Sequence, residues 1–116
     1  MSAAEIDFEP ARLELDRVVD GEGRGRLIAT GEVDISTLER LRAAIAAILT
    51  EPGLTDLVVD LEPLEFIDSA GVQALLNGKR MADDRGIAFR VANARGKVLR
   101  VLTILNLDRV LAPTTS

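Results

Sequence analysis

This 116-residue chain begins with two strand-like runs in succession, and helix-like segments then alternate with further strand-like runs. Residues 12–19 and 26–33 carry those first two runs, and the glycine-rich stretch DGEGRG between them is typical of a turn, so together they predict a β-hairpin. Residues 54–61 are rich in Leu and Val and predict a central strand buried on both faces. Residues 87–91 alternate between apolar and other side chains, and we expect a short edge strand at residues 109–111.

Three segments with helical period follow the hairpin. In the first, Ser36 is followed three residues later by Glu39, which is the spacing of a capping box with Ser36 as the helix cap, and Pro52 and Gly53 end the segment. The second segment covers residues 69–84. The apolar residues that share one face in each segment are Leu38, Leu41, Ile45 and Ile48; Val72, Leu75 and Leu76; and Val98, Val101, Leu102 and Leu105. The order β-β-α-β-α-β-α-(β) predicts an α/β fold with a mixed sheet, an N-terminal hairpin and helices packed on the sheet.

The length and net charge of the chain limit its number of domains and its possible partners. The chain is long enough for one domain over residues 1–116, with residues 1–10 and 112–116 expected as flexible ends. A net charge of −5 argues against nucleic acid as a partner, because phosphates require a basic face. No apolar stretch approaches the roughly 18 residues that cross a bilayer, and the acidic N-terminus lacks the features of a signal peptide. We therefore expect a soluble cytoplasmic protein without a membrane partner.

Two residue types are missing from the chain, and their absence removes most catalytic chemistry. Without histidine there is no Ser-His-Asp arrangement and no imidazole ligand for a metal. Without cysteine there are no thiol nucleophiles, disulfides, thiolate zinc sites or iron-sulfur clusters. Only carboxylate-based metal or acid-base chemistry remains open, so we predict a protein that is not an enzyme and holds no cofactor or metal.

The stretch FIDSAGVQALL, residues 66–76, places a hydroxyl where a strand signal meets a helix signal. Either Asp68 or Ser69 can cap the helix there, and a cap contributes about 1 kcal/mol. The same position also suits a phosphate on Ser69, because the unpaired N–H groups and the positive end of the helix dipole stabilise an anion. Gly71 costs about 1 kcal/mol relative to Ala inside a helix, which predicts that something approaches its backbone closely from outside.

Two motifs give the chain a resemblance to a known family. The run LEPLEFIDSAGVQALL resembles the signature of the STAS domain family, in particular of the bacterial anti-sigma factor antagonists. The upstream run TGEVDISTLERLRAAI resembles the second landmark of that family, a Gly-Glu-[Leu/Val]-Asp segment that enters a helix. The resemblance covers nearly the whole chain and implies the STAS-like fold, in agreement with the order of strands and helices expected above.

The resemblance also implies a mechanism and a set of site residues. It implies that the unphosphorylated protein binds an anti-sigma factor that is also a serine kinase, that this kinase phosphorylates Ser69 and ends the complex, and that a PP2C-type phosphatase reverses the switch. Ala70 stands where many members have Ser or Thr, so Ser69 is the single hydroxyl of its loop. The residues expected to contact the partner are Asp68, Ala70, Gly71 and Val72 around Ser69, and Asp34, Glu32 and Ser36 in an acidic patch beside it.

Two other functions remain open from the sequence. One is a STAS module that is never phosphorylated and serves as a subunit of a transporter or signalling assembly, with Ser69 as a helix cap only. The other is a small nucleotide-binding or carboxylate-based enzyme that uses Glu32, Asp34 and Asp68. Acidic residues at helix starts are more often partners of the helix dipole, which is also the simplest role for Asp34.

Overall fold

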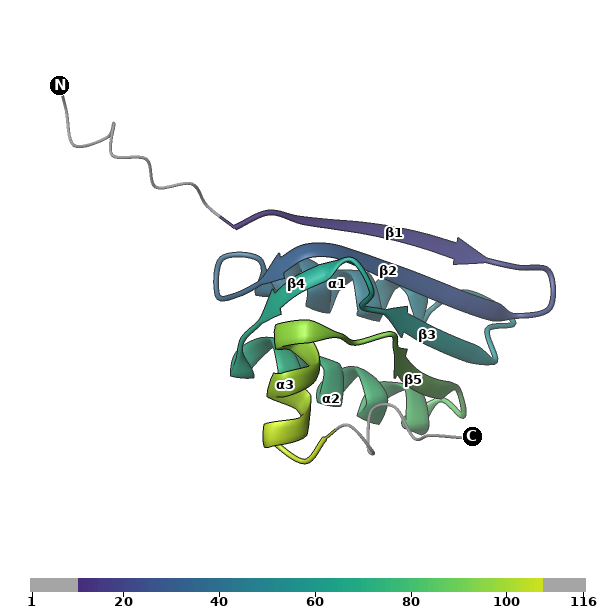
Figure 1. Cartoon of the computed structure of the whole chain (residues 1–116). Coiled ribbons are helices and arrows are strands. Elements are labelled where there is room, and N and C mark those ends of the chain that lie inside the picture. Colours follow the sequence, from purple (N-terminus) through teal and green to yellow (C-terminus); the bar gives the residue numbers. More distant parts are fainter. Residues whose placement is uncertain (1–10, 108–116) are drawn as a thin grey trace, which may run out of the picture.

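The computed structural model describes residues 11–107 and has the predicted mixed α/β architecture (Figure 1). One strand, β4, was not predicted, and the edge strand expected at residues 109–111 lies outside the described residues, as do both expected flexible ends. The elements are β1 Leu13–Val19, β2 Arg24–Val33, α1 Leu38–Ile48, β3 Asp56–Asp60, β4 Leu64–Ile67, α2 Ser69–Asp84, β5 Ala88–Ala92 and α3 Gly96–Ile104.

The sheet has five strands, and β2 pairs with three of the others. The predicted hairpin is present, with β1 antiparallel to β2 from the pair Leu13 and Gly31 to the pair Val19 and Gly25. The remaining pairs are parallel: β3 lies between β2 and β5, and β4 pairs with β2 beyond the end of β3. With ten residues, β2 is long enough to pair with β3 along its first half and with β4 along its last residues.

The pairing of β2 shifts register between Gly31 and Glu32, where β4 joins it. Gly31 has a φ of 112°, and a Cβ atom there would lie 2.1 Å from the Arg12 carbonyl oxygen, so only glycine fits. The Gly31 N–H donates to the Pro63 carbonyl oxygen, and the Asp68 N–H donates to that of Val33. The sequence does not reveal β4, because a four-residue strand carries almost no periodicity and is defined by these distant partners.

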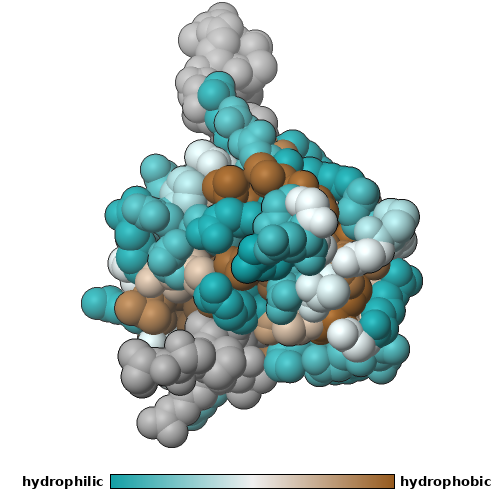
Figure 2. Space-filling model, turned by 90° about the vertical axis from the view of Figure 1, so that its right-hand side faces the viewer, coloured by the Kyte–Doolittle hydropathy of each residue, from teal (hydrophilic) through white to brown (hydrophobic). Residues whose placement is uncertain are grey.

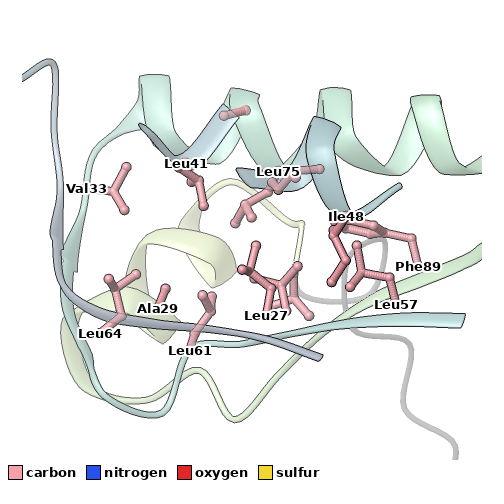
Figure 3. Packing of buried hydrophobic residues seen from close by; sticks show 14 of the residues in the cluster. Leu27, Ala29, Val33, Leu41, Ile48, Leu57, Leu61, Leu64, Leu75 and Phe89 are labelled. Carbon is pink, nitrogen blue, oxygen red and sulfur yellow. The ribbon is translucent and has the colours of Figure 1, made fainter. Parts of the chain in front are cut away.

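The main core lies between one face of the sheet and the helices α1 and α2, which cover that face (Figures 1 and 3). Side chains of the strands, such as Leu27, Leu57 and Phe89, meet Ile48 and Leu75 from the two helices (Figure 3). The predicted burial of both faces of β3 is wrong. Leu57 and Val59 are buried, but of the residues that alternate with them Asp56 and Val58 are half-exposed and Asp60 is buried.

Candidate partner-binding site around Ser69

The two motifs of the sequence meet at one end of the sheet, on the left in Figure 1. Glu32 lies opposite Phe66 and Val33 lies opposite Ile67 in the parallel pair formed by β2 and β4. Parallel strands end at the same edge, so the segment that follows β2 and enters α1 lies beside the segment that follows β4 and enters α2. The parallel pairing therefore brings residues 34–37 and Ser69 to the same edge of the molecule.

Asp68 caps α2 and leaves the Ser69 hydroxyl available. The Asp68 backbone is extended, and its carboxylate accepts a hydrogen bond of 2.9 Å from the Gly71 N–H. Ser69 is the first residue of α2, its side chain is exposed, and within residues 11–107 no hydrogen bond engages its hydroxyl. Of the two caps that the sequence left open, the structure uses Asp68, so Ser69 is not needed to stabilise the helix start.

Packing inside the protein accounts for the glycine at position 71, without the close approach from outside that the sequence suggested. A Cβ atom at Gly71 would lie 2.6 Å from Cγ1 of Ile67 and 2.7 Å from Cγ1 of Val33, both of them buried core side chains. Gly71 and Val72 are themselves buried, with Val72 only 2% exposed. These two residues pack the start of α2 against β2 and β4, and their contact with a partner stays a prediction.

The turn before α1 differs from the predicted capping box. The Ser36 N–H and hydroxyl donate to the same Asp34 carboxylate oxygen, at 2.8 and 2.7 Å, and α1 begins after Thr37 without a side-chain cap. Ser36 is therefore not the helix cap, and the Asp34 carboxylate is engaged within its own turn. The hydrogen bond from the Ser36 hydroxyl, followed by those from the Ser36 and Thr37 backbones, lowers the pKa of Asp34 below its usual value.

Two residues of this turn were missed by the sequence analysis. Thr37 is 3% exposed, and its hydroxyl donates to the Glu32 carbonyl oxygen at 2.9 Å and accepts from the Asp34 N–H at 3.0 Å. Ile35 is 84% exposed. Ile35 lies in the turn before α1, and its exposure depends on the tertiary structure.

Comparison with known proteins assigns the chain to a family. The sequence model of a family described as "Mlab, STAS domain" matches residues 6–113. The chain belongs to the STAS domain family. This finding confirms the resemblance that the two motifs predicted.

Solved structures of several other proteins share the fold of this STAS domain. An anti-sigma factor antagonist from Mycobacterium paratuberculosis matches with a TM-score of 0.73 and 24% identity, over 91% of this chain and 88% of that one. The Bacillus cell fate determinant SpoIIAA in its phosphorylated form matches with a TM-score of 0.64 and 21% identity, over 81% and 85%. A sulfate transporter family protein from Wolinella succinogenes matches with a TM-score of 0.58 and 16% identity, over 82% and 75%.

Within the described part of the chain, the carboxylates do not assemble into a metal site. Within residues 11–107, no three side chains of the ligating types lie close enough together to hold a metal ion, so Glu32, Asp34 and Asp68 form no such group. This geometry gives the carboxylate-based enzyme that the sequence left open no support. The same residues include no helix long and apolar enough to cross a membrane.

Proposed function

We propose that this STAS domain is an anti-sigma factor antagonist that works by partner switching in the cytoplasm. Its unphosphorylated form binds an anti-sigma factor that is also a serine kinase, which releases the sigma factor. The kinase then phosphorylates Ser69 and the complex ends, and a PP2C-type phosphatase restores the binding form. The similarity of the fold to anti-sigma factor antagonists, one of them in a phosphorylated form, supports this proposal.

The observation that carries the proposal is the Ser69 hydroxyl, which is exposed and free of any capping role at the first residue of α2. A phosphate there is compatible with the fold, because the first turn of a helix offers N–H groups and the positive end of the dipole. Towards a partner, the phosphate adds about −1.5 to −2 charges beside Asp68 and near Asp34. The modification therefore changes the surface strongly while leaving the helix intact.

The chemistry of the switch belongs to the partners and not to this chain. The Ser69 Oγ attacks the γ-phosphorus of ATP held by the kinase, ADP leaves, and a base of the kinase accepts the hydroxyl proton. The phosphatase hydrolyses the phosphoserine with water and returns inorganic phosphate. The STAS domain contributes the acceptor hydroxyl and the surface that the kinase recognises, and it needs no cofactor of its own.

The test uses the purified serine-kinase anti-sigma factors of the source organism. We expect one of them, with ATP, to add a single phosphate to the wild-type chain by intact mass and none to Ser69→Ala. Ser69→Ala should stay bound in the presence of ATP, whereas Ser69→Glu should bind at least about tenfold more weakly. Ser36→Ala is the matched control, because it removes the other exposed serine of this edge and should leave the phosphate count unchanged. Equal binding of wild type, Ser69→Ala and Ser69→Glu with ATP would contradict the switch.

A second candidate is a STAS module that is never phosphorylated and belongs to a transporter or signalling assembly. The similarity of the fold to a sulfate transporter family protein favours this candidate as the alternative. It predicts that no kinase of the source organism phosphorylates Ser69 under conditions in which the same kinases modify another antagonist. It also predicts that Ser69→Glu leaves binding to the partner unchanged.

A further inference from the structure

An apolar side chain stands exposed at the same end of the sheet as the proposed phosphorylation site. Ile35 is 84% exposed, the highest value among the large apolar residues of the described part of the chain. Phe66, which lies opposite Glu32 in the pairing of β2 with β4, is 40% exposed at the same end of the sheet. An exposed aliphatic side chain loses contact with water favourably when a partner covers it, by about 1.5–3 kcal/mol for a complete burial.

The turn that carries Ile35 is held by hydrogen bonds on both sides. The Asp34 carboxylate binds the Ser36 N–H and hydroxyl, and the Thr37 N–H donates to the Asp34 carbonyl oxygen at 3.1 Å. The buried Thr37 hydroxyl ties the same turn to β2 through the Glu32 carbonyl oxygen. A side chain on a turn that is already ordered loses little conformational freedom on binding, which favours its use as an anchor.

The surroundings of Ile35 include several carboxylates. Within residues 11–107, none of the carboxylates at this end forms an ion pair, although the structure has six such pairs elsewhere. These carboxylates belong to Glu32, Asp34 and Asp68, whereas Glu65 lines a hollow together with Arg95 and Lys97. An apolar centre with an unpaired acidic border is complementary to an apolar pocket bordered by Lys or Arg.

We propose that Ile35 is the apolar anchor of the partner interface, and that it enters an apolar pocket of a protein partner whose border is basic. The inference deepens the proposed function, on which it rests, because it identifies the chemistry of the surface that recognises the Ser69 end of the molecule. A second copy of this chain does not fit as the occupant, since a two-fold contact through this end would bring the same carboxylates together. Phosphorylation of Ser69 then acts on the border of the contact, while Ile35 supplies its centre.

The first experiment finds the occupant of Ile35 without assuming a kinase. Ile35 is replaced by photoreactive benzoylphenylalanine in the full chain, and the cells are irradiated. Val18, which is 58% exposed on the β1–β2 hairpin, is replaced in the same way as the matched control. That hairpin turns at the opposite end of the molecule (Figure 1), and Figure 2 shows this end with hydrophobic areas among hydrophilic side chains. We expect an adduct with another protein at position 35 and not at position 18.

The second experiment measures affinity with the purified protein found in that adduct. Ile35→Ala should weaken binding about 30-fold, as expected of an interface hot spot, whereas Ile35→Val should retain most of the affinity. Val18→Ala should bind as wild type does, and all variants should unfold at the same temperature because both side chains are exposed. The affinity of the wild type should fall as salt is added, because the border of the contact is charged.

The outcomes separate this inference from the proposed function. If the adduct forms with a protein that has no kinase activity and Ile35→Ala weakens that complex, the inference stands and the proposed function fails. If a kinase binds and phosphorylates Ser69 but Ile35→Ala binds it as tightly as wild type, the proposed function stands and the inference is overturned. The inference is also overturned if position 35 gives no adduct, or if its adduct is a second copy of this chain.

Discussion

Replacing Gly71 by alanine tests whether this glycine serves the inside of the protein. The added Cβ atom would lie 2.6 Å from Cγ1 of Ile67 and 2.7 Å from Cγ1 of Val33. Both neighbours are branched side chains, 1% and 0% exposed, so neither can move into open space. The start of α2 must therefore shift away from β2 and β4, or the core must adjust around it.

The size of the effect follows from two opposing contributions. Excess volume in a packed core costs about 1–3 kcal/mol, and two contacts below 3.0 Å place Gly71→Ala near the upper end of that range. Alanine restores about 1 kcal/mol of helix propensity relative to glycine. We expect a net loss of about 1–2 kcal/mol in the free energy of unfolding, and a melting temperature lower by about 4–8 °C for a domain of this size.

Urea denaturation of the wild type and of Gly71→Ala measures this loss directly, with Gly21→Ala as the control. A Cβ atom at Gly21 meets nothing within 4 Å, so that substitution should leave stability within about 0.5 kcal/mol of the wild type. Removing the Val33 methyl groups should relieve the crowding, so Val33→Ala should cost less in the Gly71→Ala background than alone. The reasoning is refuted if Gly71→Ala is as stable as the wild type and weakens only partner binding, which is the outcome for a glycine that serves an outside contact.

Two further predictions concern polar groups that hold the fold. Thr37→Val removes the hydroxyl that bonds to both the Glu32 carbonyl oxygen and the Asp34 N–H, and should lower the free energy of unfolding in urea by about 1–3 kcal/mol. Thr37→Ser keeps a hydroxyl and should retain most of that stability. A Thr37→Val variant as stable as the wild type would contradict this role. Burial alone would raise the pKa of Asp60, but hydrogen bonds from the Glu62 backbone and from the Asn93 and Arg26 side chains outweigh it and hold the pKa below its usual value. The carboxylate therefore stabilises the protein above its unfolded pKa near 3.8, and this contribution is lost as the pH falls through the lower folded pKa. Asp60→Asn should be less stable at neutral pH and should lose less stability on acidification, and an acid response equal to that of the wild type would disprove the linkage.

The start and end of α2 were predictable because their signals are local. The predicted segment, residues 69–84, agrees with the observed Ser69–Asp84. Asp68 immediately precedes the helix and caps it, and Gly86 follows it with a φ of 71°, which glycine adopts without strain. Such signals lie within a few residues of the boundary that they mark, so they can be read without the rest of the molecule.

The start of α1 was not predictable in the same way. Ser36 and Thr37 are adjacent hydroxyl residues, and both fit the sequence pattern of a helix start. The Thr37 hydroxyl bonds to the Glu32 carbonyl oxygen at the end of β2, and Ser36 is left to bond to Asp34. The choice between them depends on where β2 ends.

By itself, the sequence determined the hairpin, the alternation of strands with amphipathic helices, the absence of histidine and cysteine chemistry, and the two motifs that identified the family. Each of these is a local pattern or a matter of composition. Only the tertiary structure decided that β4 pairs with β2 and so brings the Asp34 turn to the same edge as Ser69, that Gly71 serves the core, and that Ile35 is exposed. The physical reason is that the pairing of β2 with β4 and the packing of Gly71 against Val33 join residues far apart in the sequence, and that the turn carrying Ile35 is tied to the end of β2.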